Sequence, residues 1–404
     1  MSVVRLVRRF ALPVMALLGS ALAGGCTAAD NLSYDEIAGE LDRIVRVRGS
    51  GADRRLDYAD TAEVSVWYMR NVLFVPFRLV LGFVAGATTI VELENPSRHV
   101  RELIAELPDE AGSALDEGAD AIARLLLIAE LDVSPANVTT ALDSAVRVMR
   151  QLGLDGVGDP SQLGLAVEPA RLDAARGGVQ LSRPKNRASE RGTRELTPAE
   201  RAAYLDALAV LVERPLPQWG DRIALVGDLR ELWLAETDRT LRGEVADRLR
   251  SAIAHAVRGA LIRALQRRDA GGADVRLCAI QQFRGLGGKA SVPFLLALMA
   301  ASAGEAGSIA ERFDRDPVVR LRLIHLCGQL RGDDALATVQ LPGRESWDTI
   351  APADFLAQVA LTERAYYSKL RVPALTALCL CLGKTRLDYD LAWVEAWYRD
   401  RQRS

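Results

Sequence analysis

A pattern of arginine and apolar residues recurs three times in the last third of the chain. Each copy begins with an apolar residue followed by arginine, at Arg276, Arg320 and Arg371. Apolar residues then follow at the three- and four-residue spacing of one helix face. The arginines are 44 and 51 residues apart, and the longer interval holds extra residues from about 342 to 352. Because helical solenoids repeat a helix pair about every 40–47 residues, the pattern predicts stacked helix pairs.

These segments resemble HEAT repeats over about residues 240–400. The closest matches are Asp316-Pro317-Val318-Val319-Arg320 and Val292-Pro293-Phe294-Leu295-Leu296. The resemblance implies stacked apolar positions and an arginine in each unit that pairs with an acidic residue of a neighbouring unit.

The chain ends with a segment from Leu387 to Tyr398 that places Trp393 and Trp397 on one face of a helix. The segment is similar to the closing segment of HEAT-containing envelope proteins from bacteria such as planctomycetes. We interpret it as a cap over the open end of the array. A platform for stacking carbohydrate rings is the alternative.

Composition supports a helical body for the whole chain. Of the 404 residues, 49% are hydrophobic but only 5% are aromatic. Alanine, leucine and arginine favour helices, whereas strands are enriched in β-branched and aromatic residues. We therefore predict an all-α protein, an α-solenoid of HEAT-like repeats preceded by a less regular helical region.

The local signals divide the chain into five parts. Residues 1–25 are predicted to be a signal peptide, 26–60 a tether and first helix, 61–152 a helical region, 153–197 a linker, and 198–404 the repeat domain. The first helix is expected to start at the capping box Ser33–Glu36 and to end near Val47. Further helices are expected at about 96–107, 112–130, 135–151, 198–213, 219–236 and 239–268. Asn95-Pro96 and Ser134-Pro135 are interpreted as N-cap and N1 pairs.

The first 26 residues have the layout of an export signal. A basic start with Arg5, Arg8 and Arg9 precedes about 14 apolar residues, too few for a transmembrane helix, and then small residues. The end, Leu22-Ala23-Gly24-Gly25-Cys26, resembles the lipobox of bacterial lipoproteins, in which the cysteine carries diacylglycerol. The leucine lies one position earlier than in the family.

Lipid attachment at Cys26 is the preferred interpretation of this junction. Ordinary cleavage after Ala21-Leu22-Ala23 and a plain N-terminal membrane anchor are the alternatives. The acylated cysteine is expected to hold the body in membrane lipid, facing the periplasm or the exterior. Thr27 is not the aspartate that retains such proteins in the inner membrane, so the outer membrane is favoured.

A second hydrophobic segment runs from Val72 to Val91 and is interrupted by Pro76 and Arg78. We consider three interpretations: a buried core helix, a hairpin or interfacial helix lying in the membrane, and a true span, which an arginine at its centre disfavours. The aromatic residues expected to contact the membrane in the second interpretation are Trp67, Tyr68, Phe74, Phe77 and Phe83.

No pattern in the sequence indicates catalysis, a cofactor or a metal. The three histidines, His99, His255 and His325, are not spaced with acids or cysteines as metal ligands are. Four cysteines in the repeat helices are expected to be buried thiols. A disulfide between Cys327 and Cys379 is the alternative.

The net charge argues against a nucleic-acid partner. It is −2 for the whole chain and becomes −5 if the three leader arginines are removed. A nucleic-acid-binding protein needs a basic face. The expected function is that of a membrane-anchored scaffold in the cell envelope with a protein partner and no catalysis. The alternative is a membrane-lipid or cell-wall handling protein, with enzymatic activity left open, that works at the bilayer through residues 72–91.

Overall fold

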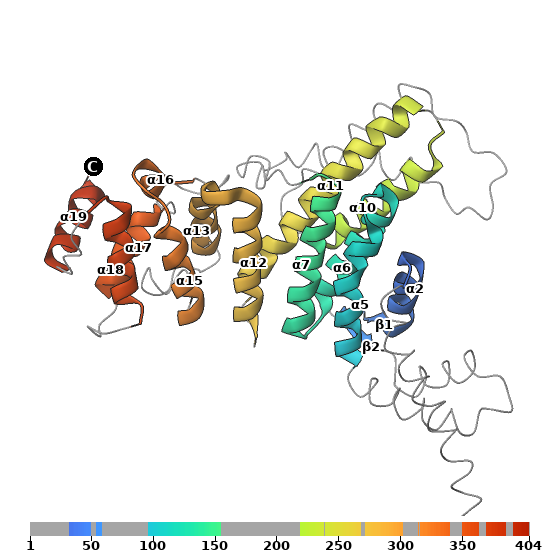
Figure 1. The fold of residues 1–404 in the computed structure, drawn as a ribbon, viewed down its shortest axis with the longest axis horizontal. Helices are drawn as coiled ribbons and strands as arrows, with labels where there is room; N and C mark the ends of the chain where they lie inside the picture. The colour runs from blue at the N-terminus through green and yellow to red at the C-terminus, as the bar shows by residue number, and fades with distance from the viewer. Residues whose placement is uncertain are drawn as a thin grey trace, which may run out of the picture.

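The computed structural model describes the chain in segments: 32–49, 54–58, 96–154, 219–237, 239–267, 271–301, 314, 316–339, 350–362, 369–384 and 391–403. Most of these residues are helical, which confirms the predicted all-α body. Figure 1 shows an elongated molecule whose later helices follow one another along the long axis, with α19 at one end. The predicted signal peptide, most of the linker and the helix at 198–213 lie outside the described residues.

The first helix, α2 (Tyr34–Ile44), starts where the sequence predicts. The Glu36 carboxylate accepts hydrogen bonds from the backbone N–H of Ser33, at 2.9 Å, and from its hydroxyl, also at 2.9 Å. The helix ends at Ile44, however, and the predicted end near Val47 is wrong. Val45 to Arg48 are extended instead, because alternating β-branched residues suit a strand better than a helix.

These residues form strand β1 (Val45–Arg48), which pairs antiparallel with β2 (Arg55–Tyr58). Val45 lies opposite Tyr58, and Val47 lies opposite Leu56. Side chains alternate between the two faces of a sheet, so these four residues share one face. Three of them, Val45, Leu56 and Tyr58, pack against the helical core. The hairpin is the only β-sheet among the described residues.

Three antiparallel helices form the centre of the N-terminal half: α5 (Pro96–Ala111), α6 (Leu115–Leu131) and α7 (Pro135–Gln151). Helix α5 continues past the predicted end at residue 107 although Pro108 lacks an N–H, because Leu107 and Ala111 are both buried. Packing here outweighs the missing hydrogen bond. At the start of α7, Ser134 makes no side-chain cap bond. The Asp132 carboxylate accepts the Ser134 N–H instead.

Two further helices pack on this group. Helix α10 (Trp219–Ala235) and the long α11 (Arg239–Gln266) lie side by side, and both contact α6. Their joined end projects from the body in Figure 1. The Arg242 guanidinium lies 4.7 Å from the centre of the Trp233 ring near this end. The second half of α11 returns to the body and is buried against α7 and α12.

The C-terminal half is a row of shorter helices. It consists of α12 (Gly272–Gly287), a 3-10 turn η4 (Gly288–Ala290), α13 (Ser291–Ala301), α15 (Pro317–Cys327), α16 (Asp333–Leu336), α17 (Pro352–Thr362), α18 (Arg371–Cys381) and α19 (Leu391–Arg403). Helix α12 packs on α7, α15 on α12, α18 on α15, and α19 on α17. Apart from the partly buried Leu286 of α12, the apolar repeat positions in α12, in α15 and in α18 with its N-cap residue are buried: Val275, Ala279, Ile280, Phe283, Val319, Leu323, Ile324, Cys327, Leu370, Ala374, Leu375 and Leu378.

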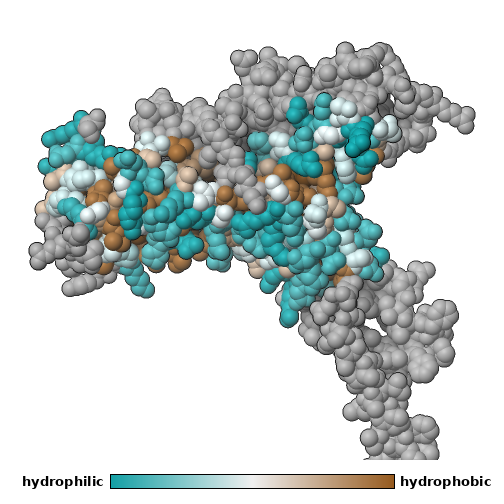
Figure 2. All heavy atoms as spheres, turned by 45° about the horizontal axis from the view of Figure 1, so that its top comes forward, coloured by the Kyte–Doolittle hydropathy of each residue, from teal (hydrophilic) through white to brown (hydrophobic). Residues whose placement is uncertain are grey.

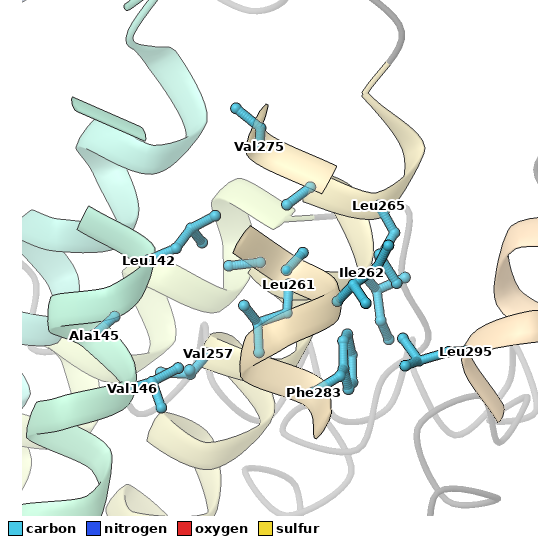
Figure 3. Packing of buried hydrophobic residues seen from close by; sticks show 14 of the residues in the cluster. Leu142, Ala145, Val146, Val257, Leu261, Ile262, Leu265, Val275, Phe283 and Leu295 are labelled. Carbon is cyan, nitrogen blue, oxygen red and sulfur yellow. The ribbon is translucent and has the colours of Figure 1, made fainter. Parts of the chain in front are cut away.

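Helix α11 joins the two halves through apolar contacts. Figure 3 shows Leu142 and Val146 of α7 facing Val257 and Leu261 of α11. Phe283 of α12 lies on the other side of α11, and its ring meets that of Phe294 edge to face at 6.2 Å. On the face shown in Figure 2, hydrophilic side chains cover most of the described surface, with hydrophobic residues visible between them.

Gly271 makes a close contact between the halves. It has a φ of 79°, and a Cβ at this position would lie 2.2 Å from Cγ of Pro135 at the start of α7. Gly271→Ala is therefore expected to destabilise the protein by more than the roughly 1–2 kcal/mol of a left-handed alanine. Gly153→Ala is the control, because Gly153 has a φ of 71° and a Cβ there would meet no atom within 4 Å. Its loss of stability therefore measures the cost of the left-handed backbone alone. The free energy of unfolding of both variants would be measured by urea titration. Equal losses in Gly271→Ala and Gly153→Ala would show that the contact with Pro135 is unimportant.

Candidate functional site

A buried polar cluster lies at the edge where α5 and α7 begin and α6 ends. Asn137 is at its centre and is fully buried. Its side-chain nitrogen contacts the hydroxyls of Tyr58 at 2.9 Å and Ser97 at 3.0 Å, and the Asp132 carboxylate at 2.9 Å. Its oxygen accepts from Nε of Arg101 at 3.2 Å. We call these five residues the Asn137 cluster.

Tyr58 and Asp132 are bonded directly within this cluster, with the phenol donating to the carboxylate. Burial, followed by the hydrogen bond from Tyr58 to Asp132, raises the pKa of Tyr58, so the phenol stays protonated and acts as a donor. Asp132 is only 2% exposed. Its carboxylate oxygens accept from the phenol, the Asn137 amide and the Ser134 N–H. Because buried polar groups need partners, this arrangement holds the hairpin on the helices.

The Asn137 cluster also joins the two ends of a long stretch of chain. Tyr58 is the last residue of β2, and Ser97 is the second residue of α5. The 37 residues between 58 and 96 include the hydrophobic segment 72–91. One amide nitrogen bonds both hydroxyls, so the two residues that flank this stretch lie at the same place on the body.

A hollow of about 520 Å³ lies on the same side of α6 and α7, where α11 ends and α12 begins. It is lined by apolar residues, among them Val138, Leu142 and Val275, together with four polar residues: Glu130, Arg263, Gln266 and Arg267. Glu130 Oε1 lies 3.3 Å from Arg263 Nη2, and Arg267 donates to the backbone oxygen of Asp132 at 3.1 Å. The hollow therefore adjoins the Asn137 cluster.

Glu130 gives this hollow a pH dependence. Burial raises the pKa of its carboxyl above 4.5, although Arg263 and Arg54 lower it. The folded state therefore holds the proton more tightly than the unfolded state, so this group's contribution to stability falls as the pH rises through and above 4.5. The melting temperature of Glu130→Gln is expected to be higher than that of the wild type at pH 7. The melting temperatures of the two proteins should become equal below pH 4.5. A variant that melts lower at pH 7 would show that the ion pair with Arg263 outweighs burial.

The first repeat arginine has the acidic partner that the resemblance implies. Arg276 and Asp314 form a two-pronged ion pair, with Nε to Oδ2 at 2.5 Å and Nη2 to Oδ1 at 3.0 Å. Both side chains are buried. The third repeat differs, because Arg371 donates from Nε to the backbone oxygen of Ala360 at 3.1 Å. These arginines hold neighbouring helices together.

The C-terminal tryptophans pack partly into the core. Trp393 and Trp397 are half-buried against the hydrophobic cluster, beside the fully buried Val394. The Lys384 ammonium lies 3.2 Å from the centre of the Trp393 ring. Arg401 of the same helix binds Asp354 of α17 at 2.8 Å. These contacts favour the cap interpretation, because a stacking platform needs an open ring face.

The cysteines of the repeat helices are buried or half-buried thiols, and no disulfide joins the described ones. Cys381, rather than Cys379, lies against Cys327, and its thiol donates to the Cys327 backbone oxygen at 3.1 Å. Burial raises the pKa of Cys278 and of Cys381 to about 11. A thiol that is protonated at neutral pH is a poor nucleophile.

Some of the remaining predicted positions lie among the described residues and others lie outside them. His99 lies 2.8 Å from Glu40. In the part of the chain that the structure describes, no group of three or more possible ligands is arranged to hold a metal. Cys26 and the aromatic residues expected at the membrane, Trp67, Tyr68, Phe74, Phe77 and Phe83, lie outside the described residues. None of the described helices is both long and apolar enough to cross a bilayer.

No pattern in the sequence predicted the Asn137 cluster. Asn137 appears in the sequence as one polar residue in the first turn of a helix, and three of its four partners are 36 or more residues away in the chain. The one local signal was Asp132, two residues before Ser134-Pro135, a spacing that suits a carboxylate accepting a turn N–H.

The fold and the site define an elongated all-α protein with a buried polar junction near its N-terminal end. Comparisons of the chain with protein-family models, with curated proteins and with solved structures give no match.

Proposed function

We propose that this protein is an exported lipoprotein, anchored through Cys26, whose helices form an α-solenoid scaffold for a protein partner in the cell envelope. The observation that carries the proposal is the row from α12 to α19, in which each helix packs on its neighbours and the repeat positions are buried. Such rows expose long surfaces made from many helices, which suit extended protein partners.

The buried polar groups support a structural role for this row. The Arg276–Asp314 pair and the Arg371 bond to Ala360 connect helices to one another. The thiols of Cys278 and Cys381 are held protonated by burial. Catalytic groups usually combine a shifted pKa with access to a cleft. The hydrogen bonds of these arginines and thiols join packed helices rather than line a catalytic cleft.

Affinity capture from the native envelope tests the scaffold. The full chain and its Cys26→Ser variant would be tagged, crosslinked and recovered, and their co-purified proteins compared. One protein recovered in constant ratio with the anchored form is the expected result. Recovery of no reproducible partner, together with turnover of an envelope lipid or glycan by the purified chain, contradicts the proposal.

Radiolabelled palmitate tests the anchor separately. Label is expected on the wild-type chain and is expected to be lost from Cys26→Ser. An unlabelled wild-type chain of the length left by cleavage after Ala23 would favour the ordinary signal-peptide interpretation.

A second candidate function is membrane-lipid handling through residues 72–91, and the Asn137 cluster limits how this segment can meet the membrane. A single crossing by this segment would leave Tyr58 and Ser97 on opposite sides of the bilayer. The five residues 92–96 reach at most about 18 Å when extended, less than the roughly 30 Å of hydrocarbon. Since one amide bonds both hydroxyls, this geometry disfavours a single crossing and is compatible both with a buried core helix and with a helix that contacts the membrane from one side.

The hollow beside the cluster gives this second function a place for a ligand. Its lining combines apolar residues with Glu130, Arg263 and Arg267. Mass spectrometry of envelope lipids extracted from the purified, detergent-solubilised chain tests it. One enriched lipid class that is lost in Leu142→Trp, a substitution that fills the hollow, supports lipid handling. An extract with the composition of the membrane opposes it.

A further inference from the structure

The hollow beside the Asn137 cluster has two arginines along one wall. Arg263 lies in the last turn of α11, and Arg267 directly follows this helix. Both line the hollow, and Gln266 between them lines it as well. Arg263 and Gln266 are exposed, and Arg267 is half-buried. A molecule in the hollow would therefore meet two guanidinium groups and one amide from a single segment of the chain.

The charge around the hollow is positive. Glu130, at the end of α6, is the acidic residue of the lining. Arg54, just before β2, lies near enough to Glu130 to lower the pKa of its carboxyl. The Asp132 carboxylate bonds within the Asn137 cluster instead. Three arginines around one glutamate leave two positive charges in excess at the hollow.

Bonds to the body hold both guanidinium groups of the wall. Arg263 Nη2 lies 3.3 Å from Glu130 Oε1, and Arg267 Nη2 donates to the backbone oxygen of Asp132 at 3.1 Å. The backbone oxygen of Arg267 accepts from Arg276, which the buried ion pair fixes in turn. A guanidinium has five N–H donors, so one such bond does not prevent it from binding an oxyanion. Because the donors are already positioned, binding would lose little conformational entropy.

The size and the charge of the hollow together indicate its ligand. Its volume of about 520 Å³ lies in the range of roughly 300–1,000 Å³ that is usual for small-molecule sites. The fork of a guanidinium matches the oxygens of a phosphate, which it binds through two parallel hydrogen bonds. A phosphate monoester carries a charge of about −1.5 to −2 at pH 7, which balances the two excess positive charges. A carboxylate would balance only one of them.

We propose that this hollow binds the phosphate monoester group of a small ligand, with Arg263 and Arg267 as the groups that bind its oxygens. Arg54 adds attraction from the rim. Glu130 competes with the phosphate for Arg263, because both are anions that pair with the same guanidinium. The site goes beyond the scaffold function and requires neither a protein partner nor lipid at Cys26.

Isothermal titration calorimetry of the purified full chain tests the site and the source of the phosphate. The probes are glycerol 3-phosphate, glycerol as its uncharged counterpart, and phosphatidic acid in detergent micelles. Glycerol 3-phosphate is expected to bind, more weakly at high salt, and glycerol is not. Binding of phosphatidic acid alone would assign the site to a lipid headgroup rather than to a soluble compound. Binding of neither phosphate compound overturns the proposal.

Substitutions in the wall are expected to change the affinity in opposite directions. Arg263→Gln/Arg267→Gln removes both charged donors and is expected to weaken binding of the phosphate by roughly a hundredfold. Glu130→Gln removes the competing carboxylate and is expected to tighten binding by roughly fivefold. General damage to the fold would not tighten binding, so the second variant keeps the test decisive.

A matched variant controls for net charge. Arg399→Gln/Arg403→Gln removes the same two charges from exposed positions on α19 and is expected to bind like the wild type. An equal loss in both double variants overturns the proposal, and so does weaker binding by Glu130→Gln. Arg263→Gln alone serves if the double variant of the wall has altered circular dichroism. Loss of the palmitate label or of the protein partner contradicts the anchored scaffold but leaves these titrations unchanged.

Discussion

Asp314→Ala is expected to lower the free energy of unfolding by about 3–5 kcal/mol, the loss typical of breaking a buried ion pair on one side. Asp314 is the acidic partner of Arg276, with both oxygens engaged and the side chains 1% and 6% exposed. Its Oδ1 also accepts the backbone N–H of Asp316, which caps α15. The substitution leaves a buried guanidinium without its counter-charge and loosens the start of α15. Urea unfolding followed by circular dichroism measures the loss.

Two further variants distinguish the loss of the buried ion pair from the loss of any ion pair and from the loss of packing. Glu395→Ala removes the partner of Arg399 in an exposed pair and is expected to cost less than about 1 kcal/mol. Arg276→Met/Asp314→Leu removes both buried charges and is expected to be more stable than Asp314→Ala, because no isolated charge remains. A double variant no more stable than Asp314→Ala would show that packing, rather than charge, sets the loss.

Asn137→Ala is expected to cost on the order of 3 kcal/mol, because it leaves buried donors and acceptors on several partners without bonds. Asp132 and Arg101 each lose a hydrogen bond to the amide, and the link between Tyr58 and Ser97 is broken. The hairpin is then held mainly by the bond from Tyr58 to Asp132 and by its apolar face. Thermal unfolding measures the stability, and tryptic cleavage after Arg48 reports on the hairpin.

Thr140→Ala is the matched control for this prediction. Thr140 lies one turn further along α7, and its hydroxyl bonds only the backbone oxygen of Ala136, at 2.9 Å. The control is expected to unfold near the wild type and to resist trypsin equally. If Asn137→Ala leaves the cleavage rate after Arg48 unchanged, the cluster does not hold the hairpin in place.

Helix positions followed from the sequence wherever apolar spacing and helix-start signals agreed. Helix α7 begins at Pro135 and ends at Gln151, as predicted, and Ser33 with Glu36 correctly marked the start of α2. Helix ends were harder to place. Helix α5 was predicted to end at about residue 107, but it continues through Pro108 to the buried Ala111. This extension depends on packing in the folded chain, which the local sequence does not reveal.

The hairpin could not be predicted with the same rules. Val45-Arg46-Val47-Arg48 alternates as a strand should, yet four residues directly after a helix are too few to indicate a strand by themselves. What fixes the strand is the pairing with Arg55–Tyr58 and the bond from Tyr58 to Asp132, 74 residues away. Contacts at that separation are set by the tertiary fold.

Of the buried polar contacts, only those of the repeat arginines could be predicted from the sequence. The recurring arginines and the resemblance to HEAT repeats together implied an acidic partner, and Arg276 has one in Asp314. The identity of that partner, and the carbonyl that replaces it at Arg371, depend on how the helices stack. The Asn137 cluster occurs once, and its residues come from four separate segments of the chain. No periodic pattern in the sequence could therefore predict it.

The packing of α19 mainly on α17 has a consequence for how the protein opens. A helix with one principal neighbour can detach while the rest stays folded, whereas α7 contacts helices on both sides and opens only with them. Amide hydrogen exchange should therefore be graded along the molecule, fast in α19, slower in α15 and α18, and slowest in α7 and the second half of α11. The protein would fray from its C-terminal end and keep its N-terminal half intact longest.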